Sequence, residues 1–261
     1  MISFGTRSRS ESRRRPLSLL DRVFYKGEWM ENGEDALHSP TVFLAEQPPN
    51  CELTPHFHRQ NQFQLFVEGE GSIGQERIGP VTVHYAGAYT GYGPILSGDA
   101  WLKYFTIRSV FDTGLTPTAQ WREKMIRGPK RHAKASAGQP WTVEQLNALE
   151  GIQRETLIAA DAGLGAELFR LPPSAAQRLL PIDGSVGQFV FVLAGTARVE
   201  GTTLSPWDSA FLPAADGEVA INSGLQGAQV VALHMPETAA EYLAHSPGPA
   251  TTESRRSETP V

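Results

Sequence analysis

Two segments of this chain repeat one strand pattern, and this repetition limits the fold more than any other feature. Residues 62–69 (QFQLFVEG) and 188–195 (QFVFVLAG) each begin with Gln-Phe, continue as an apolar run and end at a glycine. Self-similarity of this kind indicates a duplicated structural unit. We therefore predict two units of similar architecture, each built around one copy of the segment.

Short runs typical of β-strands surround both copies. Residues 78–85 and 101–108 are rich in β-branched and aromatic residues, and similar short runs follow one another between residues 166 and 235. Many short strands at close spacing, separated by turn residues, favour a barrel or a sandwich over alternating strands and helices. The predicted fold class is all-β, with a short helical connector and two jelly-roll-like barrels.

Segments of different composition join and flank the predicted barrels. In the middle segment, Thr142 followed by Gln145 can form a capping box at the start of a helix. The chain divides into five predicted parts: a disordered Arg- and Ser-rich tail (1–20), an N-terminal barrel (21–115), a partly helical connector (116–160), a C-terminal barrel (161–240) and a disordered tail rich in Pro, Ser and Thr (241–261).

Composition and charge narrow the classes of function. The chain has a net charge of −5, so it has no overall basic excess with which to bind nucleic acid. The arginines between residues 7 and 15 can contact nucleic acid or an anionic membrane, but we interpret them as part of a solvated tail. No apolar run is long enough to span a membrane. A single cysteine, Cys51, excludes an internal disulfide and favours a reducing, cytoplasmic location.

His56 and His58 form the most informative polar pair in the sequence. In an extended segment, residues two apart point to the same face, so both imidazoles project into one space. Two neutral imidazoles on one face can begin a metal site, which needs one or two further donors. In the strand that follows, Gln62, Gln64 and Phe66 are predicted to share one face, with Phe63 and its alternate neighbours on the other.

Residues 55–71 (PHFHRQNQFQLFVEGEG) resemble the first motif of the cupins, which is His-x-His, a Glu a few residues later, and then a Gly. The resemblance implies a jelly-roll-like barrel in which the two histidines, the Glu and a His from a second motif hold a divalent metal. His56 and His58 match the two histidines. Gln62 stands at the Glu position, so a neutral amide replaces the anionic ligand.

The second cupin motif, a Pro followed by a Gly two residues later and a His five residues later, fits this chain poorly. Counted from Pro94, the Gly position holds Leu96 and the His position holds Asp99. The resemblance thus implies one divalent Fe, Mn, Ni or Zn ion in the N-terminal barrel, bound by His56, His58, Gln62 and Asp99. His84 or water can replace Asp99. The alternative is a barrel that binds no metal, in which His56 and His58 hydrogen-bond a ligand or each other.

The function implied by the resemblance is action on a small organic molecule, with an anionic substrate favoured by the loss of the Glu. The hypothesis is a metal-dependent enzyme, most similar to a dioxygenase among the oxidoreductases, with lyase and isomerase chemistry as further options. Tyr92 is the candidate for catalytic proton transfer, and the candidates for substrate contact are Gln64, Phe66 and Trp101. The alternative from another class is a non-catalytic barrel that binds a small ligand or acts as a sensor.

The second barrel is predicted to be a degenerate copy. Gln188 stands at the ligand position of the repeat, but no His-x-His precedes it, and His234 is isolated. We interpret this barrel as a scaffold or a dimerisation unit, and a homodimer is an expectation for the whole chain.

Overall fold

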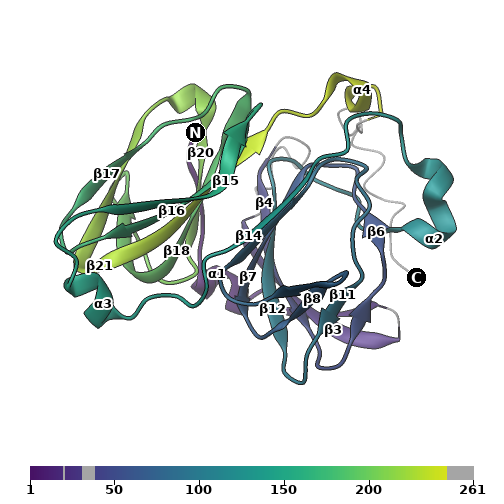
Figure 1. Ribbon diagram of the computed structural model, residues 1–261, viewed down its shortest axis with the longest axis horizontal. Helices are drawn as coiled ribbons and strands as arrows, with labels where there is room; N and C mark the ends of the chain where they lie inside the picture. Colours follow the sequence, from purple (N-terminus) through teal and green to yellow (C-terminus); the bar gives the residue numbers. More distant parts are fainter. Residues whose placement is uncertain (20, 31–38, 246–261) are drawn as a thin grey trace.

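The computed structural model describes residues 1–19, 21–30 and 39–245 and confirms the predicted all-β class. Two barrels lie side by side, with most of the N-terminal half of the chain in one and most of the C-terminal half in the other (Figure 1). The segment between them carries short helices: α2 (Thr118–Trp121), the 3-10 helix η1 (Arg122–Lys124) and α3 (Val143–Asn147). The capping box of Thr142 and Gln145 at the start of α3 is confirmed.

The N-terminal barrel consists of a large and a small antiparallel sheet. The large sheet has the strand order β14 (His132–Ser136), β10 (Thr82–Ala86), β7 (Gln62–Glu68), β12 (Leu102–Arg108), β4 (Thr41–Gln47), β3 (Arg22–Met30) and β2 (Arg15–Leu19). The small sheet has the order β5 (Glu52–Leu53), β11 (Ile95–Ser97), β8 (Gly71–Ile73) and β9 (Glu76–Ile78). A short pair, β6 (His56–Phe57) with β13 (Thr116–Pro117), lies at one end of the barrel.

The C-terminal barrel is built on two long strands, β18 (Ser185–Val199) and β21 (Val219–Pro236), which pair with each other. Its sheet has the order β1 (Ser3–Gly5), β20 (Ser209–Pro213), β18, β21, β16 (Leu164–Leu171) and β15 (Gln153–Asp161), with β17 (Ala176–Leu179) beside β21 and β19 (Thr202–Leu204) beside β18. The 3-10 helix η2 (Ala214–Asp216) follows β20. The interior is filled by apolar side chains such as Val190, Val192 and Val230.

Side-chain alternation in β7 determines which residues face the second barrel. Phe63 and Leu65 point outward into an apolar core shared by the two barrels, as Phe189 and Phe191 of the repeated segment do from the other side. Gln62 and Gln64 share one face, as predicted from the spacing, and both point into the N-terminal barrel. The two copies of the repeat therefore lie back to back, each with its outer face buried against the other barrel.

The N-terminal segment corrects the prediction of a disordered tail. Strand β1 pairs with β20 of the C-terminal barrel, α1 (Arg7–Glu11) follows, and β2 pairs with β3 of the N-terminal barrel. The arginines have specific partners: Arg14 donates to both oxygens of Glu46 and lies over the Tyr25 ring. Strand β1 has only three residues and β2 is largely exposed, so the sequence lacks the apolar alternation by which strands are recognised.

The predicted connector and C-terminal tail also contain structure that the sequence did not indicate. Strand β14 lies within the predicted connector and joins the large N-terminal sheet. Most of β15 also lies within the predicted connector, and this strand joins the C-terminal sheet. Helix α4 (Ala240–Leu243) begins at the end of the predicted C-terminal barrel, and residues 246–261 of the predicted tail lie outside the described residues. Among the helices of the described chain, none has the length and apolar character needed to cross a membrane.

The inter-barrel core gives the first testable prediction. Phe105 is fully buried, and its ring packs against Trp29 and against Phe191 of the other barrel, with centroids 4.9 and 5.0 Å away. We expect Phe105→Ala to lower the free energy of unfolding by about 3–5 kcal/mol in urea denaturation, because it leaves a cavity that the sheets cannot fill. Leu225→Ala is the control, since Leu225 is 87% exposed and its removal is expected to change stability by less than about 0.5 kcal/mol. Equal effects of the two changes would contradict a shared core.

Candidate functional site

A cavity of about 340 Å³ lies inside the N-terminal barrel and is lined by both histidines of the His-x-His pair. Strands β7 and β12 supply the polar side chains on its wall, and residues 111–115, after β12, supply part of its rim. On β12, Phe105 and Ile107 face the shared core, so Tyr104, Thr106 and Arg108 point into the cavity.

His56 is held as a neutral imidazole between a backbone carbonyl and a phenol. Its Nδ1 atom lies 2.8 Å from the Thr54 carbonyl oxygen and therefore carries the proton that it donates. Its Nε2 atom lies 3.0 Å from the Tyr92 hydroxyl, which donates to it. Gln62 Nε2 donates to the same hydroxyl at 2.7 Å. Burial lowers the pKa of His56 to about 3 and raises the pKa of Tyr92, so both groups stay neutral near pH 7.

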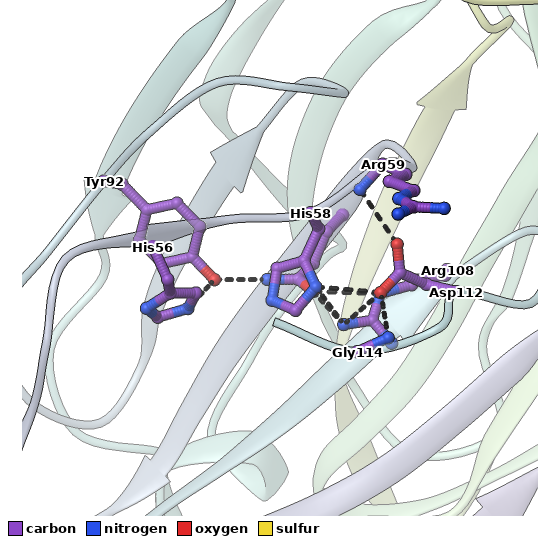
Figure 2. Close-up of polar contacts among 8 residues, drawn as sticks. His56, His58, Arg59, Tyr92, Arg108, Asp112 and Gly114 are labelled. Carbon is purple, nitrogen blue, oxygen red and sulfur yellow. Dashed lines mark hydrogen bonds and ion pairs between the residues drawn. The ribbon is translucent and has the colours of Figure 1, made fainter. Parts of the chain in front are cut away.

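His58 is oriented by a buried carboxylate (Figure 2). Its Nδ1 atom donates to Asp112 Oδ1 at 2.9 Å, and the backbone N–H groups of Arg59 and Gly114 donate to the same carboxylate at 2.9 and 2.8 Å. Burial by itself would raise the pKa of Asp112, but the charge of Arg108 and the hydrogen bond from His58 outweigh it and hold the pKa well below its ordinary value. Asp112 is therefore ionised, and it fixes His58 with Nε2 free of the proton.

Arg108 places a buried positive charge in the middle of these groups. Its Nε atom donates to Gln62 Oε1 at 2.9 Å, and Nη2 donates to the same oxygen. Nη2 lies 4.0 Å from Asp112 Oδ1 and 3.2 Å from His58 Nδ1. Because His58 Nδ1 already donates to Asp112, the guanidinium is a neighbouring charge and not a donor to that nitrogen. Burial lowers the pKa of Arg108, but a guanidinium remains protonated in proteins.

A second histidine pair lies behind the cavity wall. Gln64 Oε1 accepts from His84 Nδ1 at 2.8 Å, and His84 Nε2 lies 2.7 Å from His132 Nε2. His84 is fully buried on β10, whereas His132 is exposed on β14. The His84 ring packs 4.9 Å from the Tyr92 ring, so this pair is adjacent to the cavity without lining it.

The structure brings most of the candidate residues together and separates three of them. His56, His58, Gln62, Gln64 and Tyr92 all line the cavity. Three candidates do not, and each lies elsewhere: Phe66 packs on the Tyr104 ring in the apolar floor of the barrel, while Asp99 and Trp101 are exposed in the loop after β11. The prediction of Asp99 came from aligning the second cupin motif with Pro94, and that alignment ends in this exposed loop. Asp99 therefore lies outside the cavity lining, and the Trp101 ring lies 5.9 Å from the Tyr25 ring at an angle of 50°.

Arg108 and Asp112 are the site residues that the sequence analysis missed. A usable signal existed for Arg108, because strand alternation over residues 101–108 places Arg108 on the same inward face as Tyr104 and Thr106. No signal existed for Asp112, which follows β12 in an irregular segment and reaches His58 across 54 residues of sequence.

These residues do not fit the divalent metal that the cupin resemblance implies. The Tyr92 hydroxyl lies between His56 Nε2 and Gln62 Nε2, which is the space that a shared metal would need. Gln62 Oε1 is occupied by the Arg108 guanidinium, a cation that opposes a second one. Within the described residues, no group of three or more His, Cys, Asp or Glu side chains could hold a metal ion. The arrangement is a hydrogen-bond network centred on a phenol and a guanidinium.

The C-terminal barrel also holds a buried glutamine and a buried histidine on adjacent strands. Gln188 on β18 pairs with His234 on β21, whereas Gln62 and Arg108 lie next to Phe63 and Ile107, the last registered pair of the β7–β12 ladder. Gln188 Oε1 and His234 Nδ1 are buried without a hydrogen-bond partner in the described chain. His234 lies near a carboxylate, with its Nε2 atom 3.9 Å from Glu167 Oε2, and apolar side chains form the core of this barrel.

Comparisons with solved structures agree on the architecture. A candidate dioxygenase of Nostoc punctiforme is 12% identical, with a TM-score of 0.57 over 92% of this chain and 81% of that one. The bacterial pirin of Escherichia coli, solved with nickel(II), is 12% identical, with a TM-score of 0.54 over 91% of this chain and 100% of that one. The chain has the cupin fold.

The coconut allergen cocosin is a further match, 12% identical with a TM-score of 0.58 over 90% of this chain and 85% of that one. A candidate enzyme, a nickel-containing pirin and a seed allergen thus share the fold, so the fold alone does not decide the function. No protein-family model matches the sequence, and no curated protein matches it.

The buried neutral histidines give a pH prediction. The pKa of His56 is lowered from 6.5 to about 3, so between these values the unfolded chain binds a proton that the folded protein does not. The contribution of His56 to the free energy of unfolding has its full value above about pH 6.5. It falls by up to about 1.4 kcal/mol per pH unit as the pH is lowered toward 3. We expect His56→Gln to reduce the slope of unfolding free energy against pH between pH 6 and 4.5, measured by urea denaturation. An unchanged slope would show that His56 titrates normally.

Proposed function

We propose that the N-terminal barrel binds a small organic anion in its cavity without a resident metal. The observation that carries this proposal is the buried Arg108 guanidinium, which is 4% exposed and lies on the cavity wall. Its Nε and Nη2 atoms donate to Gln62, whereas within the described part of the chain Nη1 has no hydrogen-bond acceptor. A buried guanidinium with an unused donor is suited to a carboxylate or an enolate.

The charges around the cavity support an anionic ligand. Among the described residues, the lining includes Arg15, Lys26 and Arg108 and a single acidic side chain, Asp112. Asp112 already accepts from three N–H groups, so its charge is directed away from a ligand. Arg15 and Lys26 both form ion pairs with Glu28, which is not part of the lining. The distances to Glu28 Oε1 are 2.9 Å from Arg15 Nη2 and 3.7 Å from Lys26 Nζ. The net positive charge of the lining favours entry of an anion.

The remaining lining residues indicate the body of such a ligand. Phe24, Phe43 and Tyr104 supply aromatic surface, and Thr106 supplies a hydroxyl. A cavity of about 340 Å³ is at the small end of the range for ligand sites. These features favour a compact carboxylate with an apolar or aromatic body.

The neutral residues support a binding role over proton transfer. Tyr92 has a raised pKa and His56 a pKa of about 3, so moving the phenol proton to His56 is strongly unfavourable. In this proposal, Tyr92 orients His56 and Gln62 and is not a general base. The barrel then serves as a ligand-binding or sensory module, which was the alternative derived from the sequence.

Anion binding can be tested directly on the chelator-treated full chain. We expect benzoate to bind, measured by calorimetry, and neutral benzamide to bind about tenfold or more weakly, because only the carboxylate pairs with Arg108. Arg108→Gln should remove the difference between the two probes. Arg108→Lys keeps the charge without the planar fork and is expected to give intermediate affinity.

Arg178→Gln is the matched control, because Arg178 has a 77% exposed side chain on the other barrel. Thermal unfolding of each variant establishes that it is folded. If acetate, 2-oxoglutarate and benzoate all fail to bind the wild type, or if Arg108→Gln binds benzoate as the wild type does, the proposal is wrong. Recovery of the bound anion unchanged, followed by NMR, is the expected result for a binding module.

A metal-dependent enzyme, most similar to a dioxygenase, is the second candidate. One observation favours it: the Nδ1 atoms of His56 and His58 both donate to oxygen acceptors, as they do in histidines that bind a metal through Nε2. The open positions of such a metal would supply Lewis-acid or oxygen chemistry.

Elemental analysis separates the two candidates. After exposure to Fe(II), Mn(II), Ni(II) or Zn(II) and removal of free ions, we expect the same metal content in the wild type and in His56→Ala, because the cavity holds no ion. Stoichiometric metal in the wild type that is absent from His56→Ala would favour the enzyme and contradict the metal-independent proposal.

A further inference from the structure

We propose that His84 and His132 form a binding site for a borderline divalent metal ion, Zn²⁺, Ni²⁺ or Cu²⁺, at the edge of the N-terminal barrel. The site is separate from the cavity, and neither His56 nor His58 contributes to it. The proposal rests on the convergence of two imidazole nitrogens from adjacent strands, on the fixed orientation of one ring and on the exposure of the other.

The first argument is geometric. Strands β10 and β14 are neighbours, with His84 opposite Lys134 and Ala86 opposite His132. The two histidines are therefore diagonal neighbours on one face of the sheet. Their Nε2 atoms lie 2.7 Å apart, and the rings are inclined at 62°. Two lone pairs that converge in this way form a bidentate site once neither Nε2 carries a proton.

The second argument is the orientation of His84. Its Nδ1 atom donates to Gln64 Oε1 at 2.8 Å, so the proton lies on Nδ1 and the Nε2 lone pair points at His132. Metal-bound histidines characteristically donate the other ring N–H to a fixed acceptor in this way. Burial also lowers the pKa of His84 and of His132, which favours the neutral form that a metal requires.

The third argument is access and room. His132 is exposed, and β14 is an edge strand that pairs with β10. A tetrahedral ion with Zn–N distances of about 2.0–2.1 Å separates its two nitrogens by about 3.3 Å, so the rings must move apart by roughly 0.6 Å. An edge strand can make this shift more easily than a central one. As the ion binds, the ring proton of His132 would leave Nε2, and Nδ1 would carry the proton instead.

Neighbouring charges complete the description. Glu76 on β9 is close enough for its carboxylate to raise the pKa of His132, and it forms an ion pair with Lys134 on the same face. The carboxylate partly offsets the positive charge of Lys134 near an incoming cation. Water would take the other positions of the ion.

The experiment titrates ZnCl₂, NiCl₂ or CuSO₄ into untagged, chelator-treated full-length protein by calorimetry. We expect one equivalent to bind and His132→Ala to weaken the affinity by about tenfold or more. With Cu²⁺, electron paramagnetic resonance is expected to show coupling to two nitrogens in the wild type and loss of that signal in His132→Ala. Because His132 is exposed, this variant is expected to fold, which thermal unfolding checks.

Two control variants make the result specific. His245→Ala removes an exposed histidine, and His56→Ala removes a cavity imidazole; both are expected to bind the metal as the wild type does. The proposal is overturned if the wild type binds none of the three ions, if His132→Ala binds as tightly as the wild type, or if His56→Ala abolishes binding. Benzoate binding is measured separately, so loss of the metal site leaves the anion proposal intact.

Discussion

The alternation of side chains along β7 is the constraint on which both the architecture and the site depend. Phe63, Leu65 and Val67 enter the apolar core between the barrels, whereas Gln62 and Gln64 enter the cavity. Because one strand serves both faces, a shift of its register by one residue would place Gln62 in the apolar core and Phe63 in the site. Packing of the barrels therefore fixes the position of the polar network.

Within that network, Arg108 determines the chemistry. A guanidinium in a buried position needs acceptors and a counter-charge, and it has Gln62 Oε1 as acceptor and Asp112 4.0 Å away. The amide at position 62 is consistent with this neighbour, because it accepts from Arg108 through its oxygen and donates to Tyr92 through its nitrogen. A buried cation can attract an anion without a metal, which is the basis of the proposed anion site, and Gln62 stands where the cupin motif has a Glu.

The two barrels each contain one copy of the repeated strand segment but differ in their polar residues. In the C-terminal barrel, Gln188 pairs with His234, whose Nε2 atom lies 3.9 Å from the Glu167 carboxylate, whereas in the N-terminal barrel Gln62 accepts from the Arg108 guanidinium. The N-terminal strand β1 pairs with β20 of the second barrel, while β2 lines the cavity of the first. One continuous segment thus contacts both units, and the shared core joins them further.

The sequence by itself determined the features that depend on local spacing. These are the two repeated units, the all-β class, the shared face of His56 and His58, and the capping box at Thr142, each readable from residues a few positions apart. Only the tertiary structure decided which distant residues meet. Asp112 reaches His58 across 54 residues and His132 reaches His84 across 48, and the edge strands in the tail gain their pairing from other parts of the chain. Such contacts arise from sheet closure and strand order, which single-sequence periodicity does not encode.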